Sequence, residues 1–118
     1  MIHESQLRRR FLAEDVPHRL GQLSSTLSRL SDFMLLGRPV ESVLSVMDEA
    51  IRFVRWTHGD VSVQTAVQLE QVAGELQAWR GAWPKDAPSS NEVSRRAALA
   101  RAWSEKVLEM SGLLTPET

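Results

Sequence analysis

The segment VESVLSVMDEAIRFVRW, residues 40–56, carries more apolar side chains than a surface helix needs. Val46 and Phe53 form a stripe roughly 60–90° to one side of its main apolar face. A helix that is apolar over about half of its circumference must contact more than one neighbour. We therefore expect this helix at the centre of the fold, with Val46 and Phe53 covered by the C-terminal helix or by a second copy. The main face consists of Val40, Val43, Leu44, Met47, Ala50, Ile51 and Val54.

A helix over residues 16–36 is predicted before the central segment, with Asp15 as its N-cap. Gly37 is suited to end it in the left-handed conformation. Its apolar seam has regular helical spacing and comprises Val16, Leu20, Leu23, Leu27, Leu30 and Met34. Small residues run beside this seam, where they either let another helix approach closely or form an exposed face: Gly21, Ser24, Ser28 and Ser31.

A third helix is predicted over residues 61–81, after a short connection at residues 58–60. Gly59 suits a left-handed helix end and Asp60 can cap the next helix, so we expect an antiparallel helical hairpin. The alternative is a kinked helix that continues through Gly59. The apolar seam of this helix comprises Ala66, Leu69, Val72, Leu76 and Trp79. A second stripe carries little charge, and is either a neutral solvated face or a partner surface: Gln64, Gln68, Gln71 and Glu75.

The last helix is predicted to start at a capping box formed by Ser89 and Glu92, after a loop over residues 84–90. Gly112 is expected to end it. Its seam is apolar except for Arg96 and continues through Val93, Ala100, Trp103, Val107, Met110 and Leu114. With a short additional N-terminal helix over residues 2–14, the prediction is all-α: four main helices in an up-down, antiparallel bundle. We expect one domain, 1–118, with flexible ends at about 1–5 and 115–118.

The composition excludes several functional classes. The 118 residues carry 14 Lys and Arg against 15 Asp and Glu, a net charge of −1, which provides no general field for nucleic acid. The chain has no Cys, so disulfides and thiol chemistry are excluded. It contains neither a secretory signal pattern nor an apolar run of the roughly 20 residues that span a bilayer. We expect a cytoplasmic protein without membrane association.

No pattern of residues points to a bound cofactor or metal. The three His are His3, His18 and His58, and none follows the Glu-x-x-His spacing of helical di-metal sites. A zinc-binding His-Glu-x-x-His helix, a phosphate-binding glycine loop and a nucleophile elbow are also absent from the sequence. We therefore expect no cofactor and no metal.

Arg52 and His58 are the most specific candidates for catalytic residues in the sequence. Their spacing resembles the Arg-x(4–6)-His motif of HEPN-type ribonucleases, which are also small all-helical proteins. This resemblance would imply that both side chains act on the scissile phosphate across a dimer interface. On a continuous helix the two side chains lie about 240° apart, so the site requires a break near Trp56. The alternative is a histidine at the negative end of a helix, where its cation is favoured.

The chain contains four Trp and no Tyr. Trp79 and Trp103 lie on apolar seams and are expected in the core. Trp56 lies off the main stripe of its helix, and Trp83 stands beside Pro84 at a helix end. Each is either a plug at the end of the bundle or, with Val46 and Phe53, a candidate for an interaction surface. The leading hypothesis is a non-enzymatic interaction, assembly or regulatory module that forms a homodimer and binds an unknown protein partner. Nucleic-acid binding through Trp and Arg is a further alternative, against which the net charge argues.

Overall fold

The computed structural model describes residues 2–83 and 89–113, and these residues are helical except at short connections. No strand occurs among them, so the predicted all-α fold is confirmed. The predicted loop at residues 84–90 falls largely outside the described residues, as do Leu114 and the expected flexible end at 115–118. The helices are α1 (Ile2–Ala13), α2 (Val16–Leu35), α3 (Val40–Thr57), α4 (Val63–Ala82) and α5 (Ser90–Ser111), with a short 3-10 turn, η1 (His58–Asp60), between α3 and α4.

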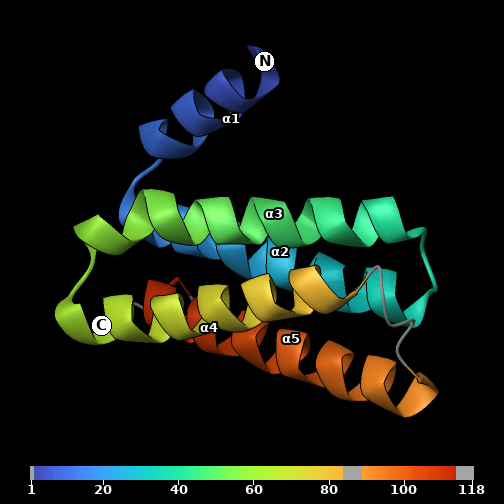
Figure 1. Ribbon diagram of the computed structural model, residues 1–118. Helices are drawn as coiled ribbons and strands as arrows, with labels where there is room; N and C mark the ends of the chain where they lie inside the picture. The colour runs from blue at the N-terminus through green and yellow to red at the C-terminus, as the bar shows by residue number, and fades with distance from the viewer. Residues whose placement is uncertain (1, 84–88, 114–118) are drawn as a thin grey trace.

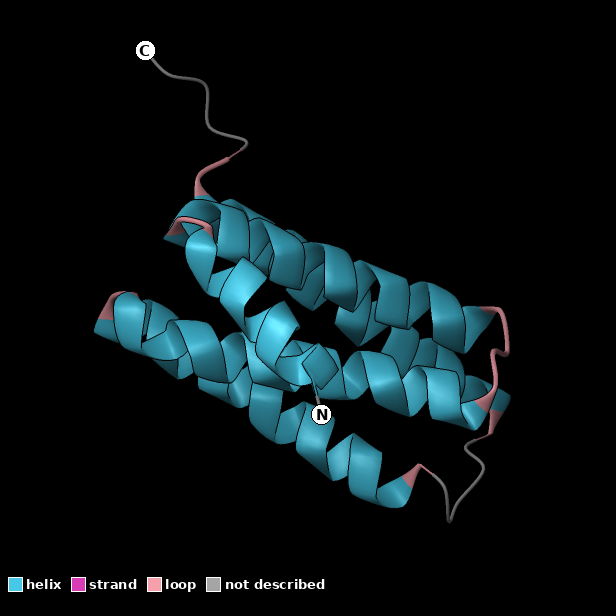
Figure 2. Cartoon of the chain, turned by 90° about the horizontal axis from the view of Figure 1, so that it is seen from above, coloured by secondary structure: helices cyan, strands magenta, loops and turns pink. Residues whose placement is uncertain are grey.

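The four long helices run alternately up and down and form one bundle (Figure 1). α2 packs closely against both α3 and α5, and α3 packs against α4. α1 packs mainly on α3 and lies over the bundle as an additional helix (Figure 2). The predicted up-down bundle with a short N-terminal helix is therefore confirmed.

Four of the predicted helix ends have the expected cap chemistry. The Asp15 carboxylate accepts a hydrogen bond from the His18 backbone N–H, and the Ser89 hydroxyl accepts one from that of Glu92. Gly37 and Gly112 have φ of 64° and 74°, the left-handed conformation that a helix-ending glycine provides. These ends are set by residues close in sequence, which explains why their chemistry is readable from the sequence.

The connection between α3 and α4 differs from the prediction at two residues. Gly59 lies inside η1 and does not have a positive φ, so the predicted left-handed helix end is wrong at this position. Ser62 caps α4 by accepting a hydrogen bond from the Thr65 backbone N–H. The Asp60 carboxylate is instead paired with Arg19 of α2, whose Nη1 lies 2.8 Å from Oδ2. Asp60 is not the cap because α4 begins at Val63, two residues later than predicted, and Asp60 lies inside η1.

The small residues of α2 form its contact with α5. The Ser24 hydroxyl donates to the backbone carbonyl of Ser104, and the Ser104 hydroxyl donates to that of Ser24, each over 2.7 Å. The Ser31 hydroxyl donates to the carbonyl of Ala97 over 2.8 Å. A side-chain hydroxyl can reach the neighbouring backbone over such distances only where two helices approach closely. The stripe beside the seam of α2 is therefore a packing surface and not an exposed face.

Phe53 is covered by α1. The Phe11 ring stacks on the Phe53 ring with centroids 4.2 Å apart and an interplanar angle of 7°. Trp56 lies tilted against both rings, with its centroid 5.8 Å from Phe11 and 6.0 Å from Phe53. The expectation that the C-terminal helix or a second copy covers Phe53 is therefore wrong. The apolar edge of the N-terminal helix buries itself there, and Phe11 is 1% exposed.

The Asp15–His18 pair at the start of α2 predicts a pH-dependent contribution to stability. The hydrogen bond from the imidazole to the Asp15 carboxylate raises the pKa of His18 above its ordinary 6.5. When folding raises the pKa of a histidine, its protonated form stabilises the folded state. This stabilisation is complete at pH values below the pKa of the unfolded chain, and it is lost as the pH rises through the pKa of the folded state. We expect a small thermal-stability advantage of the wild type over His18→Gln at about pH 5.5, absent by about pH 8.5.

Thermal unfolding of both proteins at the two pH values and at low salt measures this advantage. The Asp15 carboxylate stays ionised throughout, because its hydrogen bonds to His18 lower its pKa. An advantage of equal size at both pH values would contradict the ion-pair explanation.

Candidate functional site

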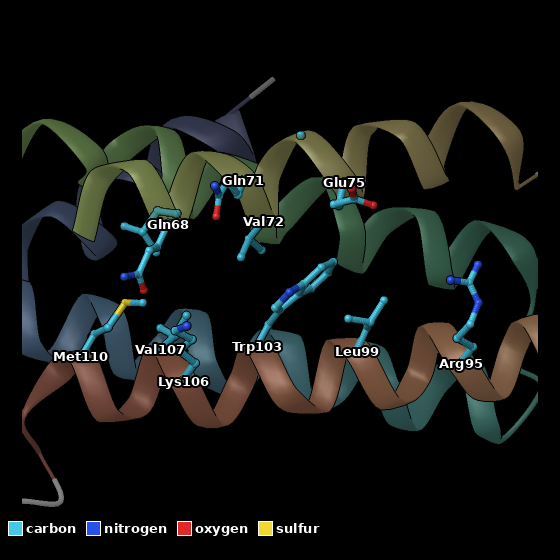
Figure 3. Close-up of a pocket in the computed structure, with 12 residues that line it drawn as sticks. Gln68, Gln71, Val72, Glu75, Arg95, Leu99, Trp103, Lys106, Val107 and Met110 are labelled. Carbon is cyan, nitrogen blue, oxygen red and sulfur yellow. The ribbon is translucent and has the colours of Figure 1, made fainter. Parts of the chain in front are cut away.

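A groove of about 700 Å³ opens between α4 and α5 (Figure 3). The close helix contacts of the bundle run from α5 to α2, from α2 to α3 and from α3 to α4, which leaves the side between α4 and α5 more open. The apolar lining is only partly covered, because Leu99 is exposed while Trp103 and Met110 are half-buried. Leu69, Val72 and Val107 lie beneath them and are buried.

The two rims of this groove differ in charge. Gln68, Gln71 and Glu75 line it from α4, whereas Arg95 and Lys106 line it from α5 (Figure 3). The low-charge stripe predicted on the third helix therefore lies along the groove. The rim on α4 is neutral to acidic, and the rim on α5 is basic.

The charged rim side chains are not paired across the groove. Arg95 binds Glu92 of its own helix, with Nη2 2.8 Å from Oε1. Within residues 2–83 and 89–113, no ion pair or hydrogen bond engages the Glu75 carboxylate or the Lys106 ammonium. Both side chains are exposed. These two charges are therefore available to a molecule that docks along the groove.

Stacked tryptophans link α4 and α5. The ring of Trp79 on α4 stacks on that of Trp103 on α5, with centroids 5.0 Å apart and an interplanar angle of 24°. The Arg96 guanidinium carbon lies 5.7 Å from the Trp79 centroid and 5.5 Å from that of Trp83, within cation–π range. Two indole rings between the helices require a wider spacing than the serines between α2 and α5. Side-chain size thus explains why the bundle is tight on one side and grooved on the other.

The predicted interaction residues lie largely inside the bundle. Val46, Phe53 and Trp83 are 6%, 3% and 7% exposed, and Trp56 is half-buried against Phe11 and Phe53. The excess apolar surface of the central helix is thus accounted for within the chain. The groove itself was not predicted. Its sequence signal is the low-charge stripe of α4, of which Gln68, Gln71 and Glu75 line the groove.

Arg52 and His58 do not show the break in the helix that a joint catalytic site requires. α3 continues without interruption through Thr57, and His58 begins the turn that follows. The two side chains therefore leave the helix in different directions, about 240° apart. The His58 Nδ1 lies 3.2 Å from Oε1 of Glu70 on α4. This geometry matches a histidine at a helix end that contacts the neighbouring helix.

The described residues show neither a grouped metal-ligand set nor a membrane-spanning helix. Among residues 2–83 and 89–113, no group of three or more His, Asp or Glu side chains is placed to hold a metal ion. No helix in this part of the chain combines the length and apolarity needed to cross a membrane. Comparison with known proteins found no matching family model, no similar curated protein and no similar solved structure.

Proposed function

We propose that this chain is a non-enzymatic interaction module, a helical bundle that forms a homodimer and serves an assembly or regulatory role. The observation that carries the proposal is the groove between α4 and α5, which combines partly exposed apolar side chains with unpaired charges at its rims. Contiguous apolar surface bordered by polar residues is typical of protein–protein contact sites. We place the module in the cytoplasm, in keeping with the absence of cysteine from its sequence.

The arrangement of polar groups supports binding over catalysis. A general acid or base must lie within hydrogen-bond reach of the proton that it transfers, and a nucleophile within hydrogen-bond reach of its base. His18 is engaged with its capping Asp15, and His58 lies against Glu70. The groove carries one acidic and two basic side chains, which do not form the continuous basic field typical of nucleic-acid sites.

Sedimentation velocity over a range of micromolar concentrations tests the proposal. We expect the weight-average mass to rise with concentration from that of one chain towards that of two. A single species with the mass of one chain at every concentration would refute the homodimer. RNA cleavage by the wild type that is lost in His58→Ala would instead favour the ribonuclease alternative.

A further inference from the structure

We infer that the second copy docks on the face formed by α4 and α5, related to the first by a two-fold axis parallel to the helices. In this arrangement α4 of each copy lies on α5 of the other. The inference rests on the proposed homodimer and assigns its surface, its symmetry and its charge pairs.

The opposite charges of the two rims favour this symmetry. A two-fold contact uses the same surface on both copies, so each pair of residues that meets across it occurs twice. The rotation places the acidic rim of α4 against the basic rim of α5 from the other copy. Glu75 lies across the groove from Leu99, and Arg95 lies further along α5 from Leu99 (Figure 3). An axis parallel to the helices keeps Glu75 at the level of Leu99 of the other copy, about one helical turn from Arg95. The Arg95 guanidinium binds Glu92 of its own helix and has further N–H donors with which it can also bind Glu75 of the other copy.

The same face exposes apolar side chains that a second copy would bury. Leu99 is 36% exposed, and Trp103 and Met110 are half-buried in the groove. Gly74 also lines the groove, and a Cβ built at this position meets nothing within 4 Å. A second helix can therefore approach the backbone of α4 closely at this point.

The size of the face is sufficient for a reversible dimer. A helix of 20 residues such as α4 is about 30 Å long and about 10 Å wide. Two such helices present roughly 600 Å² per copy, slightly below the ~800 Å² per partner of a standard stable interface. We therefore expect a dimer that dissociates at low concentration and whose affinity responds strongly to its few charge pairs.

A charge-exchange experiment tests this interface. Glu75→Lys places two positive charges against each other across the two-fold contact, and Arg95→Glu does the same with negative charges. We expect each variant alone to dimerise at least about tenfold more weakly than the wild type at low salt. A mixture of the two variants should form heterodimers, because the introduced lysine meets the introduced glutamate at one contact and the native Glu75–Arg95 pair forms at the other. The double variant E75K/R95E should recover homodimers.

Two matched controls change charge away from the groove. Glu105→Lys repeats the charge change of Glu75→Lys at an exposed position of α5, about 160° around that helix from Trp103. Arg8→Glu makes the same charge change as Arg95→Glu, at an exposed position of α1. Both should dimerise like the wild type. Circular dichroism and urea unfolding verify that every variant is folded.

The outcomes separate the inference from the function on which it rests. A wild type that never exceeds the mass of one chain refutes the homodimer itself. A wild-type dimer that both charge variants retain at unchanged affinity refutes the α4–α5 interface and leaves the homodimer standing. Loss of dimers in each variant alone, with recovery in the mixture and in the double variant, is the expected result.

Discussion

Replacing Ser104 with leucine is expected to cost about 2–4 kcal/mol of unfolding free energy. Ser104 is 7% exposed and exchanges hydrogen bonds with Ser24 where α2 and α5 approach most closely through small residues. A leucine there must displace one helix or adopt a strained rotamer, which costs typically ~1–3 kcal/mol. The lost hydroxyl contributes a further ~1 kcal/mol. Urea unfolding followed by circular dichroism measures the difference.

Ser104→Ala is the matched control for this substitution. It removes the same hydroxyl without adding volume, so we expect a loss of only about 1 kcal/mol. If leucine and alanine destabilised the protein equally, the close approach of α2 and α5 would not limit side-chain size at this position. The groove on the other side of α5 predicts the contrasting result at Leu99, where an exposed side chain leaves room for a larger residue.

Replacing Phe11 with alanine is expected to release α1 from the bundle. Truncation of a buried phenylalanine typically costs ~3–5 kcal/mol. Most packing of α1 is on α3, and the Phe11 ring stacks directly on Phe53 there. The loss should therefore appear as local opening. We expect backbone amides of α1 to exchange with solvent at least about tenfold faster, while α2 to α5 keep their protection. Hydrogen-exchange mass spectrometry resolves the two regions.

Leu27→Ala provides the comparison for this local effect. Leu27 is 0% exposed in the centre of α2, and its truncation should lower global stability by about 2–5 kcal/mol. Exchange should then accelerate throughout the bundle. If Phe11→Ala accelerated exchange to the same extent in α5 as in α1, α1 would be an integral part of the cooperative core and not a separable cover.

Helix positions and helix ends were predictable because they depend on residues a few positions apart. The hydroxyl of Ser89 and the positive φ of Gly112 bound α5 by local chemistry alone. The predicted cap at Asp60 was wrong because α4 begins two residues later than expected, at Val63. The Asp60 carboxylate pairs with Arg19, which lies 41 residues away in the sequence, and Ser62 caps α4 in its place.

The candidate site depended on how the helices sit relative to one another. Val46 and Phe53 are apolar and off the main face of their helix, a pattern that fits an interface as well as an intramolecular cover. Periodicity shows which side of a helix avoids water but not which element covers it. Only the position of α1 shows that Phe11 supplies the cover for Phe53.

By itself, the sequence determined an all-α bundle, its apolar seams and most of its helix caps, because these follow from local spacing and cap chemistry. The tertiary structure alone decided where the bundle is tight and where it is open. Serines between α2 and α5 permit close backbone contact, whereas Trp79 and Trp103 between α4 and α5 require a wider spacing. The groove therefore results from the sizes of the side chains that meet across the helices. The spacing of apolar residues along one helix does not predict which residues of another helix they will contact.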